Sequence, residues 1–220
     1  MKKTLLLVLL CITYMATATA QSKDIKAMLT KADHTSWRGM RFSYNHSNMR
    51  YSGGDEVFKF GYNGFSLGYV QAFSIAKKLP LFIEAGAGID FMRHSFDGSE
   101  GDMTDKYSIN ILALDIPVNV VYKVKLTNKI NIKPYTGIYL RLNMLAKEKD
   151  EIGGNSETFK EDYNLFDGDD GWKRVQLGWQ IGAMADYSRY SIGLGYSIDF
   201  NEITESCKFG TLSVRLGYNF

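Results

Sequence analysis

From residue 37 to the C-terminus, apolar and polar residues alternate with a period of two. The last ten residues, Thr211–Phe220, show this clearly, because one face carries only apolar side chains: Leu212, Val214, Leu216, Tyr218 and Phe220. The opposite face includes Arg215 and Gly217. Successive side chains of a β-strand point to opposite faces, so this alternation predicts a strand with one apolar and one polar face.

The same alternation recurs in seven earlier segments. The eight predicted strands are Arg38–His46, Asn63–Phe73, Leu81–Phe91, Asn110–Tyr122, Ile130–Leu145, Lys173–Tyr187, Tyr190–Phe200 and Thr211–Phe220. Bacterial membrane barrels have an even number of antiparallel strands that alternate apolar-out and polar-in. The sequence therefore predicts an all-β protein, an eight-stranded antiparallel up-and-down transmembrane β-barrel.

The connections between these strands alternate in length. Three are short: residues 74–80, 123–129 and 188–189. Four are longer: residues 47–62, 92–109, 146–172 and 201–210. Outer-membrane barrels combine short periplasmic turns with long extracellular loops, so we expect a cell outer membrane location with both termini in the periplasm.

Outward-facing aromatic residues gather at the strand ends. The turn-end group is Phe73, Tyr122, Tyr187, Tyr190, Tyr218 and Phe220, and the loop-end group is Tyr44, Phe65, Phe91, Trp172 and Phe200. Amphipathic rings collect at the two water interfaces of a membrane. A soluble lipocalin-like barrel, with the faces reversed, leaves these two girdles unexplained.

The N-terminus has the features of an export signal. Lys2 and Lys3 precede the apolar segment Leu5–Ile12, and Ala18-Thr19-Ala20 forms a cleavage pattern. We expect residues 1–20 to be removed, residues 21–36 to form a periplasmic extension with a possible short amphipathic helix, and residues 37–220 to form the barrel.

Composition changes this interpretation little. The chain is 45% hydrophobic with a mean hydropathy of −0.20, as expected when only one face of each strand meets lipid. Loss of Lys2 and Lys3 leaves 24 basic residues against 24 acidic ones. This balance argues against nucleic acid as a partner, and Cys207 is left as a single thiol without an internal disulfide.

If the apolar faces meet lipid, ten charged residues point into the lumen. They are Arg41, Glu84, Asp90, Asp115, Lys133, Arg141, Arg174, Asp186, Asp199 and Arg215. Side chains fill the interior of an eight-stranded barrel, so we expect these charges to pair into a network that plugs the lumen. An ion-conducting gate that rearranges the pairs is the alternative.

Candidate chemistry is sparse. His46 and His94 lie near serines at loop bases, but no nucleophile motif with diagnostic spacing occurs. The acidic segments 97–102 and 167–171 could attract calcium, yet both lack the full EF-hand spacing. We therefore predict no catalytic residue, no cofactor and no metal. The long connection 146–172 is rich in aromatic and charged residues and suits an adhesive or strand-like protrusion.

Three segments, together with the signal peptide, resemble the PorT-like family of small outer-membrane β-barrels. They are Leu114-Asp115-Ile116-Pro117-Val118, Lys133-Pro134-Tyr135-Thr136-Gly137 and the C-terminal Tyr218-Asn219-Phe220. The resemblance implies an OmpX-like eight-stranded barrel, and for PorT itself a part in protein secretion across the outer membrane. It transfers no catalytic residue.

Three functions are compatible with this sequence. The first is a non-enzymatic, monomeric outer-membrane barrel that presents loops for binding or adhesion, or supports the envelope. The second is an accessory of a secretion complex, and the third is a small lipid-modifying enzyme that uses His46 or His94. Expected partners are outer-membrane lipid, the barrel-assembly machinery, and an extracellular or secretion-complex protein.

Overall fold

The computed structural model describes residues 34–51, 59–76, 79–100, 103–153, 158–168 and 171–220. No helix within these ranges is long and apolar enough to cross a membrane. The predicted signal peptide and residues 21–33 of the predicted extension lie outside the described residues, and residues 34–36 have no regular structure. The division of the chain at residues 20 and 36 stays a prediction.

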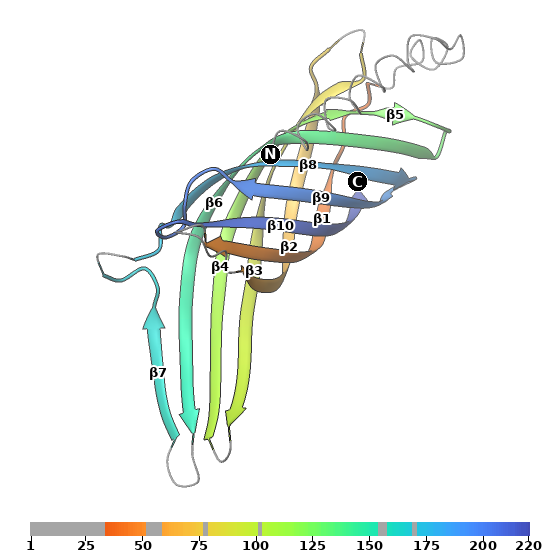
Figure 1. Cartoon of the computed structure of the whole chain (residues 1–220). Helices are drawn as coiled ribbons and strands as arrows, with labels where there is room; N and C mark the ends of the chain where they lie inside the picture. Colours follow the sequence, from red (N-terminus) through yellow and green to blue (C-terminus); the bar gives the residue numbers. More distant parts are fainter. Residues whose placement is uncertain (1–33, 52–58, 77–78, 101–102, 154–157, 169–170) are drawn as a thin grey trace, which may run out of the picture.

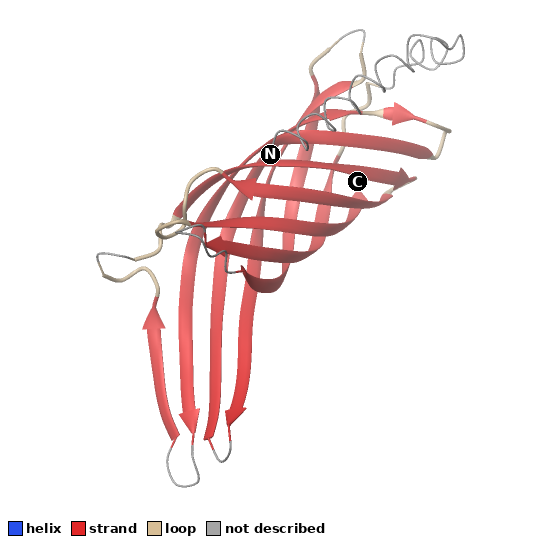
Figure 2. Ribbon diagram, viewed as in Figure 1, coloured by secondary structure: helices blue, strands red, loops and turns tan. Residues whose placement is uncertain are grey.

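The protein is an all-strand, closed eight-stranded antiparallel barrel, as the alternation predicts (Figures 1 and 2). The wall strands are β1 (Arg38–Tyr51), β2 (Lys59–Ser74), β3 (Leu81–Glu100), β4 (Met103–Tyr122), β6 (Ile130–Gly153), β8 (Val175–Tyr187), β9 (Tyr190–Asp199) and β10 (Cys207–Asn219). Each pairs with its sequence neighbour in the wall, and β1 pairs with β10 from Gly39↔Asn219 to Tyr51↔Cys207. This pairing leaves the wall without a free edge.

Alternating burial along the wall strands shows which face meets the surroundings. In β1, Arg41 and Ser43 are buried, whereas Phe42 and Tyr44 are 44% and 41% exposed. Large apolar side chains are exposed on the outer face of all eight wall strands. An exposed apolar surface of this extent marks a membrane-facing wall.

All four predicted loops are wrong in extent, because β1 and β2 continue into residues 47–62 and β10 begins within residues 201–210, and the other two loops differ most. Residues 92–109 instead extend β3 and β4 into a long hairpin, whose last pair is Glu100↔Met103. Residues 146–172 contain the end of β6 and a further strand, β7 (Thr158–Asn164), that pairs only with β6 in the described structure. Both faces of these extensions carry polar residues, so the apolar alternation stops although the backbone pairing continues.

These extensions form a four-stranded sheet that leaves the barrel, visible at the lower end of Figure 1. We call it the protruding sheet, and it consists of residues 94–100, 103–109, 147–153 and 158–164. At its base, the register between β4 and β6 shifts at Leu112/Ala113. Met144 is the extra residue, so the bulge places Ala146 inside the barrel and Leu145 outside.

A short strand, β5 (Val124–Lys125), lies in the predicted turn 123–129 and pairs with Ile132 and Asn131 of β6. The turn between β8 and β9 is tight, and Ser188 takes a positive φ of 57° there. The connections at this end of the barrel stay short, as predicted, whereas the protruding sheet rises from the other end (Figure 1).

Candidate functional site

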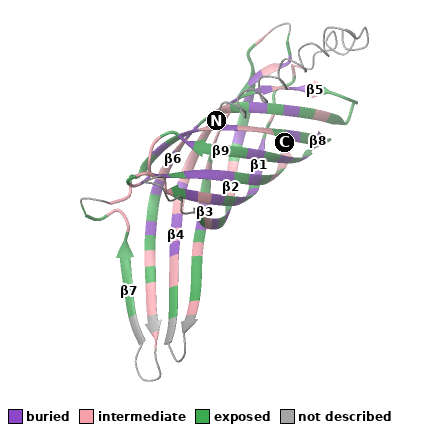
Figure 3. Ribbon diagram, in the orientation of Figure 1, coloured by how far each residue is buried: buried purple, intermediate pink, exposed green. Residues whose placement is uncertain are grey.

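The barrel interior has three layers, and the middle layer is polar. Buried and exposed residues alternate along the wall strands that enclose it (Figure 3). Its centre is Arg141 of β6, which is 4% exposed. The Arg141 Nε lies 2.9 Å from Asp115 Oδ1, and its Nη2 lies 3.3 Å from Asp90 Oδ2. Asn45 donates to the other oxygen of Asp90 at 2.8 Å. One guanidinium thus holds two carboxylates from neighbouring strands.

A second group of charges lies toward the short-turn end. Lys133 pairs with Asp186 at 2.7 Å, and Arg41 pairs with Glu84 at 3.7 Å. The indole of Trp37 joins the two pairs, because its Nε1 donates to Glu84 at 2.7 Å and its ring centroid lies 4.3 Å from the Lys133 Nζ. Burial leaves such charges little water, so each partner is needed to satisfy the other.

Asp199 and Arg215 take uncharged partners. Asp199 accepts hydrogen bonds from the Tyr139 hydroxyl and, at 3.2 Å, from the backbone N–H of Phe209. Arg215 donates to Gln180 at 3.1 Å and to Ser213 at 3.2 Å. Their side chains face the lumen, but amide, hydroxyl and backbone groups satisfy them.

The interior position predicted for Arg174 is wrong. Arg174 precedes β8, is exposed, and lies with its guanidinium carbon 4.0 Å from the centroid of the Phe166 ring. It also donates to the carbonyl of Met144 at 3.4 Å. The alternation places residue 174 in phase with the inward face, but the wall strand starts only at Val175. Nine of the ten predicted residues therefore line the lumen.

A cavity of 110 Å³ lies in this middle layer, between the charges and a wall patch that includes Gly68 and Gly88. These two glycines are directly paired, and the nearest atoms to their missing side chains belong to the backbone. The Nη1 of Arg141 and the hydroxyl of Tyr135 also line this region and have no hydrogen-bond partner in the described structure. Such a cavity has room for several water molecules that would satisfy these groups.

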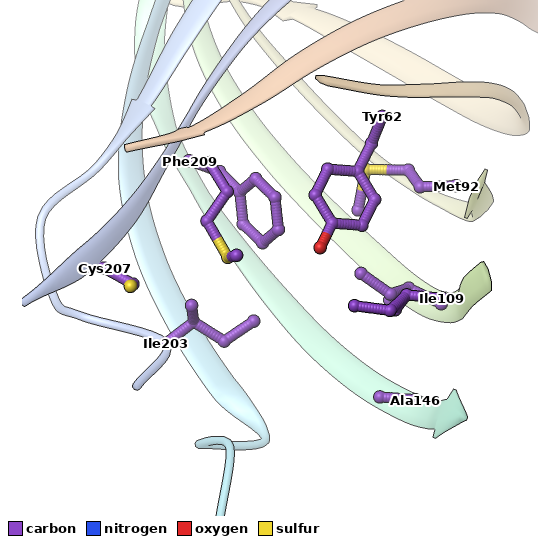
Figure 4. Packing of buried hydrophobic residues seen from close by; sticks show 9 residues of the cluster. Tyr62, Met92, Ile109, Ala146, Ile203, Cys207 and Phe209 are labelled. Carbon is purple, nitrogen blue, oxygen red and sulfur yellow. The ribbon is translucent and has the colours of Figure 1, made fainter. Parts of the chain in front are cut away.

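Apolar residues fill the loop end of the barrel, which the sequence did not predict. The cluster consists of Met49, Tyr62, Met92, Ile109, Ile111, Ala146, Ile203, Cys207 and Phe209 (Figure 4). The rings of Tyr62 and Phe209 meet edge to face with centroids 5.3 Å apart. Most of these residues lie in segments predicted as loops, and the only available signal was that inward positions such as Met49 and Met92 continue the alternation.

A smaller apolar cluster lies at the short-turn end. It consists of Ala72, Phe82, Val121, Tyr135 and Met184, with Trp37 packed against it. The Trp37 and Phe82 ring centroids are 4.6 Å apart. The polar layer thus lies between two apolar layers.

The protruding sheet has two free edges among the described residues. Pairing between β2 and β3 ends at Asn63↔Arg93, whereas β3 continues beside β4 to Glu100. The opposite edge is β7, where exposed ion pairs join it to β6: Lys160 with Glu151 at 2.9 Å and Lys149 with Asp162 at 3.7 Å. Because it lies outside the barrel, this sheet is accessible to other molecules.

Neither histidine proposed for catalysis forms a hydrogen bond with a serine in the described structure. His46 is on the outer face of β1, where its Nδ1 lies 2.9 Å from Asn63, whereas Ser47 faces inward and bonds Thr211 at 2.7 Å. His94 contacts the Gly61 carbonyl at 2.7 Å and lies among aromatic rings. Of the two acidic segments, residues 101–102 and 169–170 lie outside the described residues.

Tyr107, at the base of the protruding sheet, is one of the partly buried ionisable residues of this sheet. Burial, together with the negative charge of Glu148, raises the pKa of Tyr107 to about 12. The phenol therefore stays protonated and contributes an uncharged ring beside the loop-end cluster.

Comparison with known proteins decides the family. The model of the outer membrane protein beta-barrel domain matches residues 21–205. The chain belongs to this family. Family membership and the apolar outer wall together place the protein in the outer membrane.

The chain is also similar to several solved structures. Ail, the attachment invasion locus protein of Yersinia pestis, is 13% identical, with 84% of this chain and 98% of that chain covered and a TM-score of 0.41. Neisserial surface protein A is 15% identical, with 83% and 97% covered and a TM-score of 0.40. A major outer membrane protein from Thermus thermophilus is 18% identical, with 82% and 99% covered and a TM-score of 0.37. Among curated proteins no match was found.

Proposed function

We propose that this protein is a non-enzymatic, monomeric outer-membrane barrel that presents the protruding sheet for binding a protein outside the cell. The observation that supports this most is the edge of β3 from His94 to Glu100, which has no second strand partner among the described residues. An exposed edge strand offers unpaired N–H and C=O groups to which a partner can add a strand. On this proposal the protruding sheet is extracellular and both termini are periplasmic.

The two edges of the sheet are not equally suited to strand addition. The β7 edge carries the consecutive charged residues Lys160, Glu161 and Asp162, which discourage edge-to-edge pairing. The β3 edge carries Phe96, which is 57% exposed, with Ser95 before it and Asp97 and Gly98 after it. An exposed aromatic ring beside small residues gives a partner strand both a contact and room, so we assign binding to the β3 edge.

The lumen, on this proposal, supports the wall and does not conduct. Arg141 and its two carboxylates occupy the middle, and apolar clusters lie toward both ends. We therefore propose that nine of the ten predicted charged residues, all except Arg174, plug the lumen and have a structural role.

Site-specific photo-cross-linking tests the binding edge. A photoreactive residue at the exposed position Asp97, on intact cells, is expected to form adducts with a protein partner. Phe96→Lys should lower adduct yield about tenfold, the effect expected from losing an aromatic anchor. The matched control is Tyr163→Lys, an aromatic residue 50% exposed on the β7 edge, which should leave the yield unchanged.

Two results would overturn this proposal. One is equal adduct yield from the Phe96→Lys and Tyr163→Lys variants. The other is protease treatment of intact cells that cuts residues 34–37 and spares the protruding sheet, because the sheet would then face the periplasm.

A role in protein secretion is the alternative implied by the PorT-like resemblance. It rests on the short segments Leu114–Val118, Lys133–Gly137 and Tyr218–Phe220. If a strain that lacks this protein secretes proteins across its outer membrane normally, this alternative is wrong. If the secreted proteins are instead retained inside the cell, the alternative is favoured.

A further inference from the structure

At the loop end of the barrel, the exposed side chains of the outer face change from apolar to polar and basic. On six of the wall strands, β1, β2, β3, β4, β6 and β10, we take the first outward side chain beyond the apolar band and call this set the collar: His46, Asn63, Arg93, Asn110, Lys147 and Lys208. Beyond the ends of β8 and β9 the corresponding residues are Lys173 and Glu202. Three collar residues are basic, two are amides and one is an imidazole. No carboxylate occurs among these six positions, so the collar is positively charged.

The most closely grouped part of the collar crosses β3, β4 and β6. Arg93 pairs with Asn110, and Asn110 pairs with Lys147. Neighbouring strands lie about 4.8 Å apart, so the two basic residues start about 10 Å apart across Asn110. Both side chains are long enough to reach a single anion held above the amide.

The row directly below is apolar. Phe91 pairs with Leu112, and Leu112 pairs with Leu145. Phe91 and Leu145 are 43% and 51% exposed on the outer wall. The three polar residues therefore lie at the boundary where the membrane's hydrocarbon ends and its headgroups begin.

Two lysines of the protruding sheet that lie farther from the barrel than Lys147 form ion pairs. There, Lys149 pairs with Asp162 and Lys160 pairs with Glu151. In the described part of the chain no carboxylate lies within 4.0 Å of Arg93 or Lys147. Two uncompensated positive charges that face one another across a strand leave a favourable place for an anion.

We propose that Arg93, Asn110 and Lys147 bind the phosphate of a phosphorylated lipid headgroup in the leaflet at the loop end. Arginine offers a two-pronged donor, lysine a point charge and the asparagine amide a further N–H. The lipid's acyl chains lie against the row Phe91, Leu112 and Leu145. This apolar row is the reason to assign a lipid and not a free anion, and the assignment is independent of the partner-binding proposal.

Lipid binding to the purified, folded mature chain in detergent micelles tests this site. The probe is lipid A with two phosphates, counted by native mass spectrometry against phosphatidylcholine. Arg93→Gln with Lys147→Gln is expected to weaken lipid A binding about 30-fold, given about fivefold for each basic residue near a charged lipid surface. The control, Lys149→Gln with Lys160→Gln, removes the same charge from the protruding sheet and should change affinity less than about twofold.

The competing explanations give different results. If inorganic phosphate at millimolar concentration displaces the lipid, the site binds free anions and the lipid assignment is wrong. If dephosphorylated lipid binds as tightly as lipid A, or if both double variants lose equal affinity, the phosphate site itself is wrong. Heat-modifiable gel mobility identical to that of the wild type shows that each variant is folded.

Discussion

The middle and the loop end of the barrel interior are stabilised by different interactions. In the middle, Arg141, Asp90 and Asp115 form a buried ionic cluster in which each member depends on the others. At the loop end, Tyr62, Met92 and their neighbours pack without directional bonds. In the polar layer, loss of a single partner should therefore lower the free energy of unfolding strongly. In the apolar layer, the free energy of unfolding should fall in proportion to the side-chain volume removed.

The largest effect is expected from Arg141→Met. This change removes the cation with which Asp90 and Asp115 form ion pairs, and losing one partner of a buried pair costs about 3–5 kcal/mol. The free energy of unfolding, measured by urea denaturation in lipid bilayers, should fall by that amount. The triple variant Arg141→Met, Asp90→Asn, Asp115→Asn should recover most of the loss, and no recovery would show that packing, not charge, holds this layer.

A smaller effect is expected in the apolar layer. Ile111 is fully buried, and Ile111→Ala should lower the free energy of unfolding by about 2–4 kcal/mol through lost contacts and a residual cavity. Ile111→Val, in the same denaturation experiment, should cost about 1 kcal/mol. Equal losses from the two variants would contradict volume-proportional packing.

The Trp37 contact connects the two kinds of layer. Trp37→Phe keeps a ring against Phe82 but removes the donor to Glu84. Loss of one hydrogen bond to a charged group should cost about 1.5 kcal/mol. The control is Trp179→Phe on the outer face of β8, which should change the free energy of unfolding less. A larger loss from Trp179→Phe than from Trp37→Phe would show that the hydrogen bond of Trp37 is unimportant.

The smallest effect concerns the exposed ion pairs of the protruding sheet, which contrast with the buried pairs. Lys160 holds the pKa of Glu151 below its ordinary value. This pair therefore contributes stability above the ordinary glutamate pKa and loses it as the pH falls through the lowered value. Hydrogen exchange of β7 backbone amides, corrected for intrinsic rates, should show easier opening at about pH 3 than at about pH 6.

Lys160→Gln provides the control for this prediction. It removes the ion pair at every pH, so the difference in β7 opening between the acidic and the near-neutral measurement should shrink. An unchanged difference would assign the pH dependence to another acidic group of the sheet.

The sequence by itself determined the wall of this barrel. Alternation is a local property that lipid on one side and a polar lumen on the other impose on each strand, so strands such as β1 and β9 could be located without knowing their neighbours. The same alternation placed nine of the ten predicted charges inside. It did not pair them, because which carboxylate Arg141 meets depends on register across three strands.

Only the tertiary structure decided the two ends of the interior and the protruding sheet. The loop-end cluster brings together Met49, Met92 and Phe209 from distant segments, and the alternation that continues through Met49 and Met92 does not show that such residues meet. The position of Arg174 depends on where β8 begins, and the bulge at Met144 depends on the pairing with β4. Outside the membrane, water meets both faces of a strand, so backbone pairing between strands defines the protruding sheet and the residue pattern alone does not.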